Sequence, residues 1–191
     1  GAFLARLVEK SAALGVGDPR ERDVTIGPVI DERAAQRYEE ACIEARRDGH
    51  VALGGERLRG GLFDKGAYVA PAIVTDLPDG HRLSRDELFL PFLTIHRFRS
   101  LDEALRRGND VPYGLTAGVY TSDEAELRAF LDGAEAGVLY ANRASGATTG
   151  AWPGIQTFCG WKGSGVTGKG GLGPWYVPQF MREQSHTIMC A

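Results

Sequence analysis

Residues 142–165 form a glycine-rich segment with the composition of a ligand-binding loop. They follow an apolar run, residues 137–141, that predicts a buried strand. Loops that leave the carboxyl ends of parallel strands build the ligand sites of α/β proteins. Glycine there lets backbone N–H groups approach a ligand closely and adopt positive φ. A purely structural loop is the alternative, but loops of this length are usually functional or disordered.

Two nucleotide-binding patterns overlap this segment, and neither has the required context. Residues 163–168 fit G-x-G-x-x-G, and residues 163–169 fit G-x-x-x-x-G-K. Each motif needs a strand before it and a helix after it. The following residues, Gly-Gly-Leu-Gly-Pro at 170–174, cannot continue as a helix, and Gly170 stands where the P-loop needs a hydroxyl. We therefore expect no nucleotide P-loop here.

A catalytic thiol and a metal site are also weakly supported by the sequence. Cys159 lies in the loop, but a reactive thiolate needs a base, a cation or a helix N-terminus beside it. Lys162 is the only cation close in sequence. The four histidines have no metal-ligand spacing, so we expect no metal site; they are His50, His81, His96 and His186.

Two further polar segments precede predicted strands. Residues 86–91 place two adjacent carboxylates before an apolar pair, and residues 109–114 join a predicted helix to a strand. From the residues alone, each is best interpreted as structural: a polar turn with one core Phe, and a turn in which Asn and Gly have their usual roles.

The elements that must position these segments follow an α/β pattern. Helices are predicted at residues 2–14 and at residues 31–48, where Asp31 is the N-cap and Cys42 a core residue. Capping boxes at Ser100/Glu103 and Thr121/Glu124 start two more helices, at 101–108 and up to 134. Strands are predicted at 51–53, 68–70 with 73–74, 92–98, 115–120 and 137–141. Strand, helix, strand, helix, strand over residues 92–141 predicts a right-handed parallel arrangement.

The end of the chain predicts an exposed strand. Residues 175–190 finish in alternating polar and apolar side chains, with no partner strand nearby in the sequence. Because an unpaired edge strand is costly, we expect it to pair with another subunit in a homo-oligomer.

Composition excludes several functional classes. The 191 residues are 43% hydrophobic and 25% charged, typical of a soluble globular protein. The net charge of −3 argues against nucleic-acid and membrane partners. Three scattered cysteines indicate a reducing compartment, the cytoplasm or an organelle matrix. The first predicted helix has no cap before it, so we expect the chain to be a piece of something longer.

Together these segments resemble the C-terminal part of the aldehyde dehydrogenase superfamily. Glu87-Leu-Phe89-Leu-Pro91 is similar to its Glu-x-Phe-Gly-Pro motif, and residues 109–117 are similar to its Asn-x-x-x-Tyr-Gly-Leu-x-Ala segment. Asn142 followed by residues 156–165 resembles its Asn and Pro-Phe-Gly-Gly-x-Lys-x-Ser-Gly. The order and intervals agree over nearly the whole chain.

Within the superfamily the chain most resembles the 1-pyrroline-5-carboxylate (L-glutamate γ-semialdehyde) dehydrogenases, through Asn142-Arg143, residues 149–151 and the tail at 168–185. The resemblance implies NAD-dependent oxidation of L-glutamate γ-semialdehyde to L-glutamate in proline catabolism. Another aldehyde substrate is one alternative. A non-catalytic oligomerisation or anion-binding module is the other.

The resemblance also assigns roles to five residues. It implies that Glu87 binds the nicotinamide ribose hydroxyls and that Phe89 packs beside the nicotinamide. Backbone amides at Gly150 and Ala151 would hold the substrate α-carboxylate in a cavity shared with Glu87, and Phe158 would form a wall of the aldehyde pocket. Leu90 departs from the family Gly, and Thr157 and Cys159 depart from the family Pro and Gly.

The catalytic machinery itself is expected outside the chain. In the family the nucleophilic cysteine, the general-base glutamate, the oxyanion-stabilising asparagine and the Rossmann domain all precede the segment that corresponds to residue 1. We therefore expect no catalytic residue here and no activity of the chain alone. The expected fold is an α/β, parallel-sheet catalytic domain of aldehyde dehydrogenase type over residues 1–170, with a C-terminal tail at 171–191 that carries the oligomerisation strand.

Overall fold

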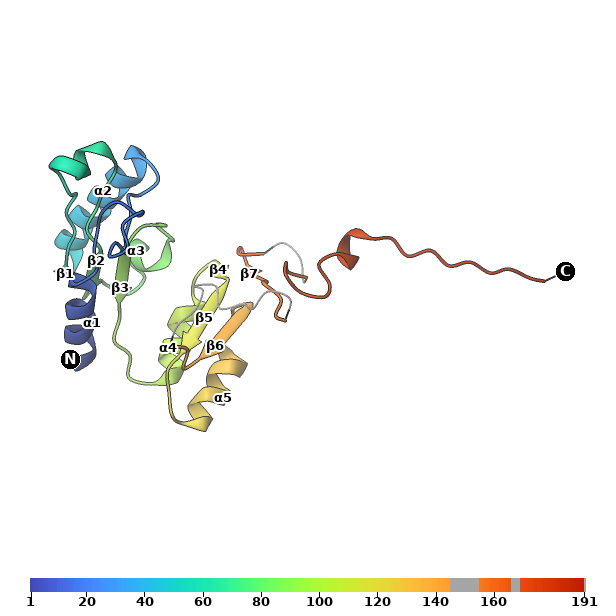
Figure 1. Cartoon of the computed structure of the whole chain (residues 1–191). Coiled ribbons are helices and arrows are strands. Elements are labelled where there is room, and N and C mark those ends of the chain that lie inside the picture. The colour runs from blue at the N-terminus through green and yellow to red at the C-terminus, as the bar shows by residue number, and fades with distance from the viewer. Residues whose placement is uncertain (145–154, 166–168, 191) are drawn as a thin grey trace. The chain divides into compact units, whose positions relative to one another are not determined.

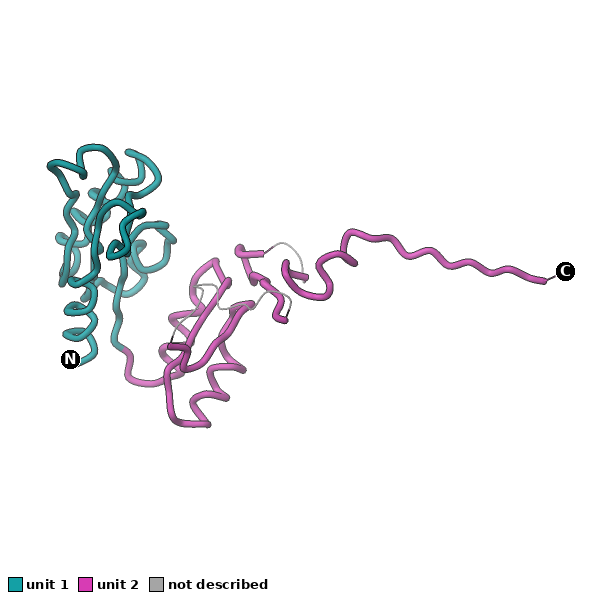
Figure 2. The backbone as a smooth tube through the Cα atoms, viewed as in Figure 1, with its two compact units in different colours: residues 1–97 teal, residues 98–191 magenta. Residues whose placement is uncertain are grey.

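The chain folds into two compact units, Gly1–Arg97 and Phe98–Ala191 (Figure 2). The structure is a computed structural model and describes residues 1–144, 155–165 and 169–190. Among these residues, no helix is both long enough and apolar enough to cross a membrane.

The first unit is a three-stranded sheet with a long helix packed against it (Figure 1). Strand β2 is central, antiparallel to β1 and parallel to β3. The elements of the first unit are α1 (Ala2–Ala12), α2 (Glu32–Asp48), β1 (His50–Leu53), the 3₁₀ turn η1 (Gly61–Lys65), β2 (Ala72–Thr75), α3 (Arg82–Arg85) and β3 (Phe92–Ile95).

Helix α2 forms where the sequence predicts it. The Asp31 carboxylate accepts a hydrogen bond from the Ala34 N–H at 2.7 Å, and the helix ends at Asp48, before Gly49. Its small-residue stripe is buried against the sheet and the loops that flank it. Cys42 is fully buried, and burial raises the pKa of its thiol, so its predicted place in the core is confirmed.

Tyr38 is the polar centre of this core. Its hydroxyl donates to the Ala70 carbonyl and accepts from the Gly55 N–H at 3.0 Å. Burial raises the pKa of the phenol well above its usual value, which keeps the hydroxyl protonated. One side chain thus satisfies two backbone groups of the segment that connects β1 to β2.

The strand predicted at residues 68–70 is wrong. Tyr68, Val69 and Ala70 are buried, as a core strand would be, but Val69 makes only an isolated bridge with Arg57. Pro71 follows and has no N–H to donate, which limits a continuous ladder through this segment. The strand β2 begins after it, at Ala72.

Within its described residues, the second unit carries two small sheets and two helices (Figure 1). Of the strand-helix-strand-helix-strand arrangement predicted over residues 92–141, the parallel pair β5–β6 confirms the second half, and the pairing of the strand at residues 92–95 with that of residues 116–119 is wrong. The earlier strand β3 pairs with β2 of the first unit. The elements are α4 (Leu101–Asn109), β4 (Tyr113–Gly114), β5 (Thr116–Val119), α5 (Glu124–Gly133), β6 (Val138–Ala141), β7 (Trp161–Lys162) and the 3₁₀ turn η2 (Pro178–Phe180).

The two predicted capping boxes have different outcomes. Ser100 caps α4, accepting from the Glu103 N–H at 3.2 Å, but the Glu103 carboxylate accepts from the Arg99 N–H instead of from Ser100. The box at Thr121 is wrong. Asp123 is the N-cap of α5, because its carboxylate lies one residue before the helix and accepts from two of the first N–H groups.

Residues 181–190 are exposed and form neither helix nor strand in the part of the chain that the structure describes (Figure 1). Their pairing with a second subunit therefore stays a prediction. The expected domain boundary between residues 170 and 171 likewise stays a prediction.

Tyr38→Phe is expected to lower the free energy of unfolding by about 1–3 kcal/mol, because two buried backbone groups lose their partner. Urea unfolding followed by circular dichroism measures the change. Tyr113→Phe, at a residue that is 41% exposed, is the matched control, with an expected change below about 0.5 kcal/mol. Equal effects of the two variants would contradict the role given to Tyr38.

Candidate functional site

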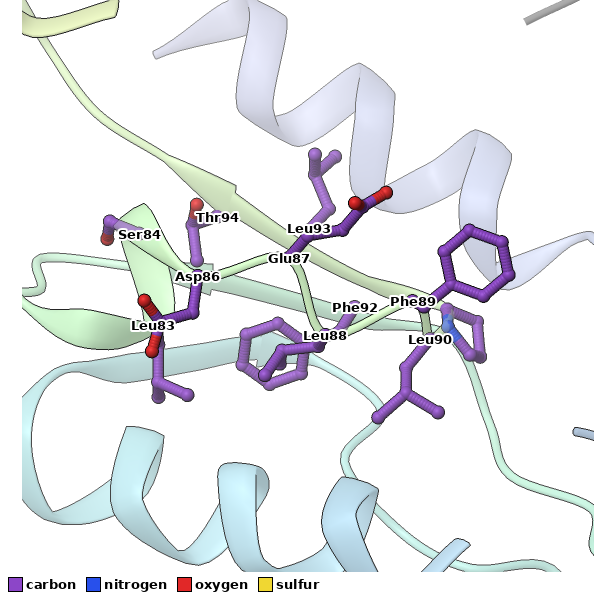
Figure 3. Close-up of a pocket in the computed structure, with 11 residues that line it drawn as sticks. Leu83, Ser84, Asp86, Glu87, Leu88, Phe89, Leu90, Phe92, Leu93 and Thr94 are labelled. Carbon is purple, nitrogen blue, oxygen red and sulfur yellow. The ribbon is translucent and has the colours of Figure 1, made fainter. Parts of the chain in front are cut away.

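The segment that joins α3 to β3 borders an open pocket of about 600 Å³ in the first unit (Figure 3). This segment contains the predicted cofactor residues Glu87 and Phe89. The lining residues are Leu83, Ser84, Asp86, Glu87, Leu88, Phe89, Leu90, Pro91, Phe92, Leu93 and Thr94.

Side chains along this segment separate to two sides. Leu88 and Leu90 pack into the core against α2, whereas Glu87 and Phe89 project to the other side (Figure 3). Phe89 is 88% exposed and has a φ of 57°, a conformation that bulky residues rarely adopt. The left-handed residue turns the chain so that both flanking leucines reach the core and the aromatic ring is displayed.

Leu90, which departs from the family motif, has a structural explanation. Its side chain packs against the buried cluster that includes Tyr38, Cys42 and Val69. It points away from Glu87 and Phe89 (Figure 3). The departure therefore adds to the core and leaves the displayed side open.

The side of the segment to which Glu87 and Phe89 project offers two complementary groups to a ligand. An exposed carboxylate at Glu87 can accept hydrogen bonds from two hydroxyls. The Phe89 ring offers an apolar face on which a planar ring can stack. Leu93 on β3 is 47% exposed and points to the same side (Figure 3), an apolar neighbour that the strand prediction did not single out.

Helix α3, which begins this segment, is tied to α2 by polar contacts. The His81 Nε2 lies 3.1 Å from Asp48 Oδ2, and Arg82 pairs with Glu44. Hydrogen bonds from Arg47 and His81 lower the pKa of the Asp48 carboxyl below its usual range. Leu83 is buried between these contacts and the core. The sequence did not reveal this cluster, because its members come from two helices.

Glu44, Asp48 and His81 place one potential metal-ligand atom each within 4.8 Å of one another. The arginine on Glu44 and the hydrogen bonds at Asp48 already engage the two carboxylates. The charged groups of this cluster thus have protein partners, and the cluster serves as a polar contact between α2 and α3.

The remaining predicted site residues belong to the second unit. Phe158 is half-buried, and its N–H donates to the Gly171 carbonyl at 2.8 Å. Cys159 donates its thiol to the Gly137 carbonyl at 3.3 Å. Gly150 and Ala151 lie outside the described residues.

Two motif residues that are 53 positions apart, Asn109 and Lys162, meet at the end of α4. The Lys162 ammonium donates to the Asn109 carbonyl at 2.5 Å and pairs with Glu135 at 2.6 Å. The Asn109 side chain in turn donates to the Gly133 carbonyl and accepts from the Glu135 N–H. Because Lys162 is committed to these oxygens, it has a structural role here instead of activating Cys159.

Gly114 in the same group shows why its motif needs a glycine. Its N–H donates to Ser164 Oγ at 3.0 Å. A Cβ at this position would lie 2.5 Å from the Glu135 carbonyl oxygen, which a side chain cannot accommodate. Polar contacts therefore connect the motif residues Asn109, Gly114, Lys162 and Ser164 of the second unit.

Asn142 closes the end of β6 in a similar way. Its backbone has a φ of 52°, and its side-chain amide accepts from the Thr121 N–H and donates to the Thr121 carbonyl. Tyr120 donates its hydroxyl to the Arg143 carbonyl at 2.6 Å. The start of the glycine-rich segment is thus fixed to the end of β5.

Comparison with known protein families identifies the family. The profile of the aldehyde dehydrogenase family matches residues 1–185. The chain therefore belongs to the aldehyde dehydrogenase family, and its α/β fold, with parallel strand pairs, is of the aldehyde dehydrogenase type.

Solved structures give the same assignment. A 1-pyrroline-5-carboxylate dehydrogenase from Thermus with bound NAD is 35% identical, with a TM-score of 0.78, over 88% of this chain and 31% of that chain. A 3,6-anhydro-L-galactose dehydrogenase, solved with NADP, is 30% identical, with a TM-score of 0.80, over 89% of this chain and 35% of that chain. A betaine aldehyde dehydrogenase from Staphylococcus aureus, 22% identical with a TM-score of 0.83, covers 94% of this chain and 35% of that chain and supports the fold alone. The chain spans about a third of the length of these structures.

Neighbouring substitutions test the two-sided segment. Leu90→Ala is expected to lower the free energy of unfolding by about 1–3 kcal/mol, less than for a fully buried leucine. Phe89→Ala should change it by less than about 0.5 kcal/mol, because the ring is exposed. Urea unfolding measures both, and a Phe89→Ala loss as large as the Leu90→Ala loss would contradict the arrangement.

Proposed function

We propose that this chain is part of an NAD-dependent dehydrogenase that oxidises L-glutamate γ-semialdehyde to L-glutamate in proline catabolism. The observation that carries the cofactor part is the joint display of Glu87 and Phe89 on one side of an anchored segment. The substrate part rests on the motif resemblance and on the 35% identity to a 1-pyrroline-5-carboxylate dehydrogenase.

The described residues suit the nicotinamide half of a dinucleotide. The Glu87 carboxylate would bind the two ribose hydroxyls, and the Phe89 ring would limit the orientation of the nicotinamide. Bound NAD supplies the acceptor for the hydride that leaves the substrate. The chain's own contribution is to fix the position of that acceptor, because hydride transfer depends strongly on geometry.

The second unit would bind the substrate. Backbone amides at Gly150 and Ala151 would hold the α-carboxylate, and Phe158 would border the aldehyde chain. The thiol nucleophile and the general base of the reaction would come from the part of the full-length protein that this chain does not contain. The isolated chain should therefore not oxidise aldehydes.

A different aldehyde substrate is the second candidate. The 30% identities to a 3,6-anhydro-L-galactose dehydrogenase and to a lactaldehyde dehydrogenase favour it. The two candidates differ in whether a substrate carboxylate must be held, so the glycine-rich segment distinguishes them.

The exposed tail supports a homo-oligomer. Ile188 and Met189 are each 86% exposed, which is unfavourable for apolar side chains in water unless another surface covers them. We infer that residues 181–190 pair with a sheet edge of a second copy. From the scattered cysteines we propose that the protein acts in the cytoplasm or an organelle matrix.

Glu87→Gln in the full-length protein is expected to raise the KM for NAD by about tenfold, the factor for one lost charge-assisted hydrogen bond. The KM for the aldehyde should change little. Asp86→Asn alters the adjacent carboxylate and is the matched control. Steady-state kinetics of both variants would refute the ribose-binding role if Asp86→Asn had the larger effect on the KM for NAD.

Gly150→Val tests the carboxylate anchor. A branched side chain should hinder approach to the backbone amides and raise the KM for L-glutamate γ-semialdehyde by about tenfold, since hydrogen bonds to a charged group are lost. The KM for propanal, which has no carboxylate, should change by less than about twofold on the same grounds. Equal changes for both aldehydes would favour the second candidate.

A further inference from the structure

We infer that His81 is a positioning residue for the cofactor segment, holding Glu87 and Phe89 through a bridge between α2 and α3. The inference rests on the proposed function, because it assigns His81 to the same cofactor site. His81 lies outside the pocket lining and outside every motif that carries the family resemblance.

Both ring nitrogens of His81 have partners on different elements. The Nδ1 accepts a hydrogen bond from the Leu83 N–H at 3.2 Å and so caps α3. The Nε2 lies 3.1 Å from Asp48 Oδ2, at the last residue of α2, and 3.6 Å from Glu44 Oε1. Since Nδ1 accepts, the proton is on Nε2, and the ring donates it to Asp48.

In this tautomer His81 connects α3 and α2, with a hydrogen-bond acceptor at Nδ1 and a donor at Nε2. An acceptor at Nδ1 fixes the second N–H, that of Leu83, in a helix only four residues long. A donor at Nε2 fixes the ring itself against α2. Helix α3 alone is too short to be stable, so its position depends on contacts of this kind.

The position of α3 is passed on directly to the cofactor segment. The Asp86 N–H donates to the Arg82 carbonyl at 2.8 Å, so the C-cap residue of α3 directly precedes Glu87. Leu83 and Leu88 pack in the same buried cluster as Ala41 and Ala45 of α2. Rotation of α3 would therefore move the Glu87 carboxylate relative to Phe89, while the leucines would keep the segment folded.

The Arg82–Glu44 ion pair makes a second tie between the helices, but it is of a different kind. The Arg82 side chain is 52% exposed, whereas that of His81 is only 11% exposed. The Glu44 side chain is 16% exposed, so only the arginine end of the pair faces solvent, where screening by salt weakens it. The mostly buried imidazole is the better candidate to hold a fixed geometry.

Three substitutions at His81 in the full-length protein separate its two contacts. His81→Asn keeps an acceptor near the Nδ1 position, because asparagine is a good N-cap. His81→Gln places an amide donor nearer Asp48 and loses the cap. His81→Ala removes both. His50→Ala, at an exposed histidine on β1, is the matched control.

Two readouts are needed. Hydrogen exchange of the peptide 82–92 reports the order of the segment directly, and steady-state kinetics report its effect on the cofactor. For His81→Ala we expect exchange in this peptide to accelerate and the KM for NAD to rise by about threefold to tenfold, the factor for one net hydrogen bond. The KM for the aldehyde should not change. His81→Asn and His81→Gln should each restore part of the loss, and His50→Ala should change neither readout.

Unchanged exchange of residues 82–92 in His81→Ala would overturn the inference whatever the kinetics. Faster exchange with an unchanged KM for NAD would also overturn it, provided that Glu87→Gln raises that KM. If exchange accelerates and neither His81→Ala nor Glu87→Gln affects the KM for NAD, the anchoring by His81 is supported and the proposed cofactor role of Glu87 fails. If His81→Ala raised the KM for NAD and the KM for the aldehyde by the same factor, the role of His81 would be generally structural and the inference would be overturned.

Discussion

Burial of one face of α2 is the interaction on which the first unit depends. The stripe from Ala34 to Ala45 carries mostly alanines, so the helix approaches the sheet and its flanking loops closely enough for Tyr38 to bond backbone groups beyond it. The same face receives Leu83, Leu88 and Leu90. The residues that frame the pocket are thus held by the core itself, and the exposed groups between them inherit a fixed position.

The second unit reaches a fixed geometry by another route. Apart from Phe130 and a few residues near it, the second unit has little buried apolar surface among its described residues. Side-chain amides, an ammonium and a hydroxyl instead bond backbone groups at the ends of its elements. Such bonds are directional, so they select one arrangement of the connecting loops more sharply than apolar contacts can.

Local patterns in the sequence were sufficient for α2, α4, β5 and β6, because caps and apolar periodicity act over a few residues. They failed at Val69, where burial resembles that of a strand but the next residue is a proline, and at Thr121, where a nearer carboxylate became the cap. The family resemblance pointed to Glu87 and Phe89. Neither approach could find the contact of His81 with Asp48, since 33 residues separate them. The positive φ that exposes the Phe89 ring likewise could not be predicted from the sequence, because phenylalanine rarely adopts this conformation.

The left-handed backbone at Phe89 has a consequence for attempts to make this protein more heat-tolerant. A glycine there would relieve about 1–2 kcal/mol of steric cost, so selection for thermal resistance alone should favour losing the ring. Under the proposed role of Phe89 beside the nicotinamide, selection for turnover should favour retaining it. Position 89 is therefore a place where durability and performance oppose each other, and a library screened for only one of them would drift away from the other.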